Sequence, residues 1–119
     1  MKTIEKTISF ETSKHIQSVI KDVETEYYYE YAEVTYILSN GNDFQEWDDY
    51  KTLTTDEAID ILPETIWNED NWTHDGIAIM KRVGGWYYIE YYNISFDWDT
   101  LIESIEKMLL YLYDNKLLK

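Results

Sequence analysis

Residues 76–92, with the sequence GIAIMKRVGGWYYIEYY, decide the fold prediction because they combine two β-rich runs with a Gly-Gly pair. Glycine reaches the positive φ angles of tight turns at little steric cost, so Gly84-Gly85 predicts the tip of an antiparallel hairpin. A two-residue loop at these glycines places Met80 opposite Ile89. The chain is therefore expected to contain an antiparallel sheet rich in aromatic side chains.

Asn40-Gly41 marks a second predicted hairpin, because this dipeptide is the strongest short turn signal between alternating apolar residues. Residues 30–38 alternate in this way before it. A two-residue turn at Asn40-Gly41 pairs Ile37 with Phe44 across the two strands.

Apolar residues at helical spacing predict three helices. The first has apolar residues at positions 16, 19, 20, 23 and 27, with Thr12 or Ser13 available as its N-cap. The second opens at Thr54, and the last starts at Asp97 or Asp99. Thr54 and Glu57 have the spacing of a capping box, in which each side chain bonds the backbone N–H of the other residue.

With an alternating strand at residues 3–10, the elements follow the order β-α-β-β-α-β-β-α. The prediction is one α+β domain over residues 1–119, with a single five-stranded, mainly antiparallel sheet and helices packed mostly on one face. A chain of 119 residues fits one domain, and the absence of cysteine fits a reducing compartment. Since no segment approaches about 18 uninterrupted apolar residues, a cytoplasmic location is expected.

Negative charge is concentrated in one part of the chain. The formal net charge is -14, and most of it lies between Asp43 and Asp75, where Lys51 is the one base. Such a patch repels nucleic acid and acidic lipid and attracts a basic partner. The eleven carboxylates of this acidic stretch, all predicted to bind the partner, are Asp43, Glu46, Asp48, Asp49, Asp56, Glu57, Asp60, Glu64, Glu69, Asp70 and Asp75.

Metal binding would have to use carboxylates and at most two imidazoles, those of His15 and His74. Residues 68–75 form the best local cluster of such ligands. They lack the spacing of a calcium loop, and no H-E-x-x-H motif is present. A solvated acidic loop is the expected reading, and neither a metal nor an organic cofactor is predicted.

Glu90 is the carboxylate that an enzymatic reading would use, because it lies mid-strand among aromatic residues. The alternative reading is a half-exposed strand residue paired with Lys81 across the second hairpin. No nucleophile elbow, catalytic cysteine or phosphate-binding glycine motif is present. The chain is therefore predicted not to be an enzyme, with a small enzymatic or ligand-binding domain built on an aromatic pocket and Glu90 as the alternative.

The aromatic runs at residues 27–31 and 86–92 suggest a second binding surface. Consecutive tyrosines in a strand point to both faces of a sheet, so one face can build the core while the other stays outside. Tyrosine and tryptophan anchor many protein interfaces. Trp86, Tyr88 and Tyr92 are therefore predicted to bind a partner, while core and edge packing, or burial in a homodimer or larger homo-oligomer, remains the alternative.

The charge pattern favours a small acidic inhibitor that occupies the positively charged nucleic-acid-binding surface of a nuclease or another nucleic-acid-handling enzyme. Charge and size resemble those of phage-encoded nucleic-acid mimics, including anti-restriction and anti-CRISPR proteins, and of the acidic immunity proteins of bacterial toxins. The resemblance implies a bacterial or phage-infected host cell. The chain itself is predicted not to bind DNA or RNA, because every phosphate repels it.

Overall fold

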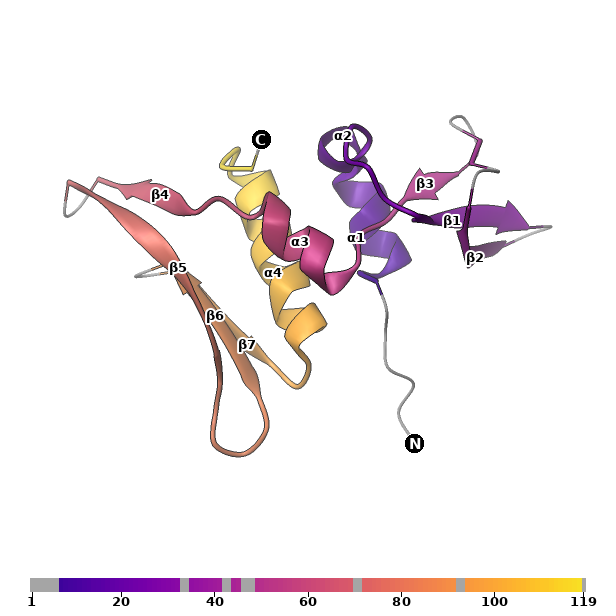
Figure 1. Cartoon of the computed structure of the whole chain (residues 1–119). Coiled ribbons are helices and arrows are strands. Elements are labelled where there is room, and N and C mark those ends of the chain that lie inside the picture. Colours follow the sequence, from indigo (N-terminus) through magenta and orange to yellow (C-terminus); the bar gives the residue numbers. More distant parts are fainter. Residues whose placement is uncertain are drawn as a thin grey trace. The chain divides into compact units, whose positions relative to one another are not determined.

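The computed structural model describes residues 7–32, 35–41, 44–45, 49–69, 72–91 and 94–118 (Figure 1). Within these ranges the protein is α+β, with four helices and two antiparallel sheets of three and four strands. The predicted single five-stranded sheet is therefore wrong. The chain forms two compact units, Met1–Ala58 (unit 1) and Ile59–Lys119 (unit 2). That both units make up one domain stays a prediction.

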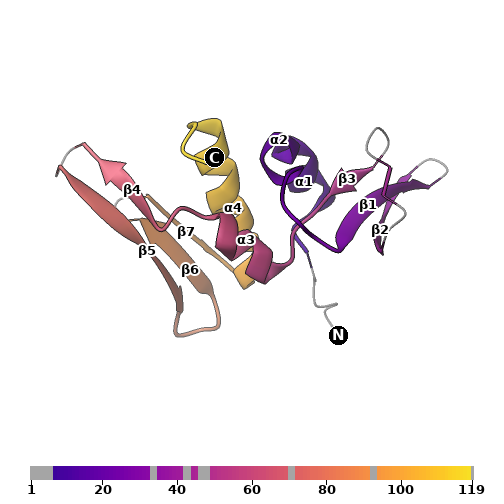
Figure 2. The same ribbon diagram turned by 45° about the horizontal axis from the view of Figure 1, so that its top comes forward.

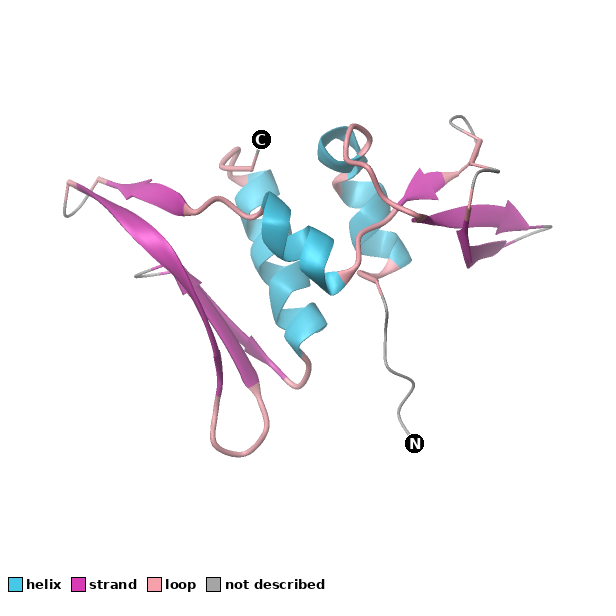
Figure 3. Ribbon diagram, viewed as in Figure 1, coloured by secondary structure: helices cyan, strands magenta, loops and turns pink. Residues whose placement is uncertain are grey.

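Unit 1 pairs short helices with a three-stranded sheet in the order β2-β1-β3 (Figure 3). Its aromatic side chains pack on one another, and the ring of Phe10 stacks on that of Tyr36 with 4.4 Å between centroids. Helix α3 begins in unit 1 and ends in unit 2. The elements are α1 (Phe10–His15), α2 (Gln17–Ile20), β1 (Tyr27–Ala32), β2 (Thr35–Asn40), β3 (Tyr50–Lys51) and α3 (Thr55–Ile61).

The first hairpin forms at a different place from the predicted one. β1 and β2 pair with Ala32 opposite Thr35 and Tyr27 opposite Asn40, so the chain reverses between residues 32 and 35. Gly41 follows the end of β2 with φ +113°, and the prediction that Asn40-Gly41 forms the hairpin tip is wrong. Ile37 lies opposite Glu30 and not opposite Phe44. The tyrosine-rich run of β1 has a higher β propensity than residues 42–47, which include Asn, Asp, Gln and Glu.

The start of the chain also differs from the prediction. Residues 3–6 of the expected first strand lie outside the described residues. Thr7 forms an isolated bridge with Thr54, and Phe10 already begins α1. Ser9 caps that helix by accepting a hydrogen bond from the N–H of Thr12 at 3.2 Å. The N-cap is therefore Ser9 and not Thr12 or Ser13, and in place of the one predicted helix the chain forms α1, α2 and the start of β1.

Unit 2 is a four-stranded sheet in the order β4-β5-β6-β7, with α4 packed against β6 and β7 (Figure 2). Ile89 and Tyr91 point to the α4 side and are fully buried, as are Ile105 and Leu109 of the helix. The opposite face of the sheet carries the even-numbered residues of β5 and β6. The elements are β4 (Thr65–Asn68), β5 (Thr73–Lys81), β6 (Tyr87–Tyr91), β7 (Ile94–Trp98) and α4 (Leu101–Asp114).

The predicted hairpin at Gly84-Gly85 is confirmed, with a register that differs by one residue. Ile79, not Met80, lies opposite Ile89, and the N–H of Arg82 donates to the Trp86 carbonyl at 2.7 Å. The loop therefore has three residues. A shift of one residue moves every side chain of a strand to the other face relative to its neighbour.

Helix α4 begins later than predicted. Thr100 is its N-cap and accepts a hydrogen bond from the N–H of Glu103 at 3.2 Å, whereas Trp98 closes strand β7. Asp97 and Asp99 are therefore not the cap. In the part of the chain that the structure describes, no helix has the length and apolar composition needed to cross a bilayer.

Candidate functional site

Asp49, in the acidic stretch, is a structural residue. It is buried, and its carboxylate accepts hydrogen bonds from the N–H groups of Gln45 at 2.8 Å and Tyr31 at 3.3 Å. A buried carboxylate with two backbone donors fixes the local chain and presents little charge to a partner. The prediction that Asp49 binds the partner has no support from this position.

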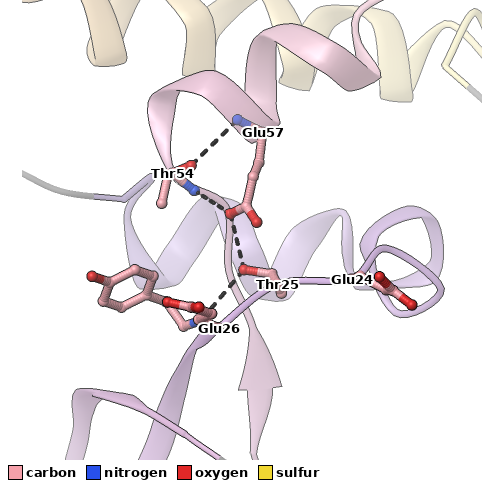
Figure 4. Close-up of a pocket in the computed structure, with 6 residues that line it drawn as sticks. Glu24, Thr25, Glu26, Thr54 and Glu57 are labelled. Atoms are coloured by element: carbon pink, nitrogen blue, oxygen red, sulfur yellow. Dashed lines mark hydrogen bonds between the residues drawn. The ribbon is translucent and has the colours of Figure 1, made fainter.

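Glu57 is also held within the fold. The predicted capping box is confirmed: Glu57 Oε1 accepts from the Thr54 N–H at 2.9 Å, and the Glu57 N–H donates to Thr54 Oγ1 at 3.3 Å. Thr25 donates its hydroxyl to the same carboxylate oxygen at 2.9 Å, so both threonines reach the Glu57 side chain (Figure 4). The carboxylate thereby joins the start of α3 to the segment that leads into β1.

These contacts border an open hollow in unit 1 with a volume of about 420 Å³. Glu24 and Glu26 are exposed beside it, and Lys51 donates from Nζ to the carbonyl oxygens of Lys21 at 2.8 Å and Val23 at 3.2 Å. The lysine thus bonds the backbone and leaves the exposed carboxylates available to solvent. The lining residues are Glu24, Thr25, Glu26, Tyr27, Thr54 and Glu57.

Asp75 is the third engaged carboxylate of the stretch. Its Oδ2 accepts from the Asn68 amide at 2.7 Å and its Oδ1 from the Thr73 hydroxyl at 3.2 Å, which ties β4 to β5. Among the described residues no group of three or more histidines or carboxylates is arranged to hold a metal ion. The imidazole of His74 packs edge-on against Trp67 at 5.1 Å between centroids. The absence of a metal or cofactor stays a prediction.

The exposed carboxylates of the stretch belong to both units. Asp56 is exposed in unit 1, and Asp60, Glu64 and Glu69 are exposed in unit 2. The other four predicted partner-binding carboxylates lie outside the described residues: Asp43, Glu46, Asp48 and Asp70.

Glu90 does not face Lys81, so the predicted pairing is wrong. The observed register sets Ala78 opposite Glu90 and Tyr87 opposite Lys81, which places the two charged residues on opposite faces. Glu90 accepts a hydrogen bond from the Tyr88 hydroxyl at 2.6 Å. This bond stabilises the neutral phenol and raises the pKa of Tyr88.

The tryptophans that the structure describes are all exposed to solvent. All four in the described residues lie in unit 2 and are exposed, Trp67 by 45%, Trp72 by 79%, Trp86 by 49% and Trp98 by 45%. Trp67 and Trp72 meet edge to face at 5.9 Å between centroids. Of the three aromatic residues predicted to bind a partner, Trp86 is exposed, Tyr88 is half-buried and Tyr92 lies outside the described residues.

Trp67, Trp72 and Trp98 were missed in the sequence. Trp67 alternates with the buried Ile66 and Asn68 along β4, and this period-two pattern was the available signal. It covers only four residues, between a proline and an acidic loop, so the pattern is shorter than a typical strand.

Trp86 and Trp98 border a second open hollow of about 320 Å³, together with Asp97 and Asp99. Both carboxylates are exposed. The Lys107 ammonium lies 4.9 Å from the centroid of the Trp98 ring, a cation–π contact. This hollow brings two indoles and two carboxylates to one end of the sheet, next to the Gly84-Gly85 loop.

Comparison of the chain with protein-family models, curated proteins and solved structures found no match in any of the three.

Proposed function

We propose that the protein binds a basic partner protein, and that it does so through the exposed tryptophans of unit 2 and the carboxylates near them. The observation that carries the proposal is the exposure of every described tryptophan, at least 45% in each case. Tryptophan is among the side chains that lose most free energy by facing water, and it is usually largely buried.

An exposed indole contributes strongly once a partner covers it. Tryptophan is enriched among the few interface residues that supply most of the binding free energy. Trp67 and Trp72 form one aromatic pair, and Trp86 and Trp98 lie together around the second hollow. A small ligand is usually held in a single enclosed pocket. Two separate pairs of exposed tryptophans therefore suit a protein partner better than a small ligand.

Charge selects the kind of partner. A formal charge of -14 repels a second copy of the chain, nucleic acid and acidic lipid alike, and it speeds the approach of a positively charged protein. Enzymes that handle nucleic acid carry extended basic surfaces for phosphate. We therefore propose that the partner is such an enzyme and that binding of this protein blocks its nucleic-acid surface.

The test starts with the partner recovered from an extract of the source cells and identified by mass spectrometry. Both proteins are then purified and their dissociation constant is measured at low and high salt. Replacement of Trp67 and Trp72 by alanine should weaken binding by at least about 2 kcal/mol, roughly thirtyfold. Leu117→Ala removes another exposed apolar side chain of unit 2 and is the matched control.

Unchanged affinity of the double tryptophan variant would contradict the proposal, as would affinity that does not depend on salt. A variant that loses a tendency to self-associate, with no effect on a second protein, would identify a homo-oligomer interface instead.

A further inference from the structure

We infer that the hollow formed by Trp86, Asp97, Trp98 and Asp99 accepts an arginine side chain of the partner. This inference rests on the proposed function and names the chemical group recognised at one part of the binding surface.

Strand pairing brings the four residues together. Tyr87 lies opposite Trp98 and Tyr88 opposite Asp97. The ladder ends at the pair of Tyr87 and Trp98, and the residue before β6 and the residue after β7 flank this last pair. Trp86 and Asp99 occupy these two positions. The hollow is therefore built on the ends of two hydrogen-bonded strands and not on a long loop.

The carboxylates of Asp97 and Asp99 do not cap the helix that follows them. Thr100 and Glu103 cap α4 by themselves, since the Thr100 hydroxyl donates to Glu103 Oε1 at 2.8 Å and accepts from the Glu103 N–H. Asp97 and Asp99 are exposed, and neither side-chain carboxylate accepts a hydrogen bond from the residues that the structure describes. They differ in this respect from Asp49, Glu57 and Asp75, and they are available to an incoming donor.

Neighbouring aromatic rings already hold cations. The Lys107 ammonium lies over Trp98, and the guanidinium of Arg82 lies over Tyr88 with its carbon 4.8 Å from the ring centroid. Within the described residues no cation lies over the ring of Trp86. Indole gives the strongest cation–π contact of the aromatic side chains, so Trp86 offers an open place next to two carboxylates.

Arginine matches this set of groups better than lysine does. Its planar guanidinium stacks on an aromatic face and at the same time donates paired hydrogen bonds to carboxylates. A lysine ammonium is a strongly hydrated point charge, which loses more on leaving water. An acidic or apolar side chain would meet two carboxylates with no compensating donor.

The test is an NMR titration of the whole protein with an end-blocked pentapeptide, Gly-Ser-Arg-Ser-Gly, with the lysine peptide as comparison. The indole N–H signals of Trp86 and Trp98 should shift saturably with the arginine peptide, and those of Trp67 and Trp72 should not. Asp97→Asn combined with Asp99→Asn should weaken the fitted affinity about tenfold. Asp60→Asn combined with Glu64→Gln removes the same charge elsewhere in unit 2 and should have a small effect.

The inference fails if Trp86 and Trp98 do not respond, if the lysine peptide binds as tightly, or if the two double variants weaken binding equally, which would indicate net charge alone. The partner experiment with Trp67 and Trp72 does not use this hollow. Either experiment can therefore fail while the other succeeds, and the two failures are distinguishable.

Discussion

Replacement of Gly84 by alanine should move the Trp86 indole, whereas the same replacement at Gly85 should leave it in place. Both glycines have positive φ angles, +103° and +91°. A Cβ atom on Gly84 would lie 2.8 Å from Trp86 Nε1 and 3.5 Å from Cδ1, whereas a Cβ on Gly85 would meet nothing within 4 Å. The two adjacent positions thus share the backbone strain and differ in the contact with the indole.

The two variants share one cost in stability, and Gly84→Ala carries a second. A non-glycine residue at such a φ angle costs roughly 1–3 kcal/mol, and this cost applies to both. Gly84→Ala adds a close contact that Trp86 relieves by leaving its preferred rotamer, because its indole is 49% exposed and has room to turn. Such a change of rotamer costs about 0.5–1.5 kcal/mol.

The assay combines urea unfolding with NMR detection of the Trp86 indole N–H and titration with the arginine peptide. Both variants should lose stability, and only Gly84→Ala should shift the Trp86 signal strongly and weaken peptide binding. If Gly85→Ala displaced the indole or reduced affinity as much, the idea that Gly84 makes room for the Trp86 side chain would be refuted.

Three further outcomes follow from the described contacts. Asp49→Ala should destabilise the fold by about 1–3 kcal/mol, measured by urea unfolding, because it leaves the backbone N–H groups of Gln45 and Tyr31 without their acceptor. A neutral effect would show that water replaces the carboxylate. Tyr91 is fully buried and donates its hydroxyl to the Pro63 carbonyl at 2.5 Å, and burial raises its pKa from 10.0 to about 12. Its contribution to stability is therefore complete below pH 10 and is lost as the pH rises towards 12, so the unfolding free energy between pH 9 and 12 should fall less steeply in Tyr91→Phe than in the wild-type protein. Equal slopes would contradict this origin of the pH dependence. Charge reversal of three exposed carboxylates of unit 2, Asp60, Glu64 and Glu69, should slow association with the partner in stopped-flow mixing and leave stability equal or slightly higher. The same reversal of three exposed carboxylates of unit 1, Asp22, Glu24 and Glu26, should slow association less. Equal association rates for the two triple variants would show that only net charge matters.

Local signals in the sequence predicted the elements that depend on a few neighbouring residues. The hairpin at Gly84-Gly85 and the capping box of Thr54 and Glu57 are both confirmed, because each is set by backbone angles or hydrogen bonds within four residues. The last helix is confirmed for the same reason, although its cap is Thr100, a residue that bonds Glu103 in the first turn.

Choices between competing strand partners were not predictable in this way. Asn40-Gly41 favours a turn, but a turn forms a hairpin only if the strands on its two sides pair with each other. Here β2, which precedes the turn, pairs with β1, the strand before it in the chain. The one-residue register of β5 and β6 depends on the loop length, which Gly84-Gly85 leaves open between two and three residues. This register decided the wrong pairing of Glu90 with Lys81.

The candidate site was partly predictable. Sequence located the negative charge and Trp86, but it could not separate exposed carboxylates from those that accept hydrogen bonds inside the fold, such as Asp49 and Asp75. Trp67 was missed as a surface residue because β4 is short and contains polar residues that weaken a strand pattern. Trp98 fits the apolar stripe of the last helix, since it precedes Leu101 and Ile102 by three and four residues, but it ends β7 instead.

The central claim is that a partner covers the exposed tryptophans of unit 2, and side-chain oxidation by hydroxyl radicals tests it most directly. The rate of oxidation of each indole is measured by mass spectrometry in the free protein and in the purified complex. Trp67, Trp72, Trp86 and Trp98 should be oxidised readily in the free protein and should be protected in the complex. If all four were oxidised as fast in the complex as in the free protein, the partner would bind elsewhere and the account would be contradicted.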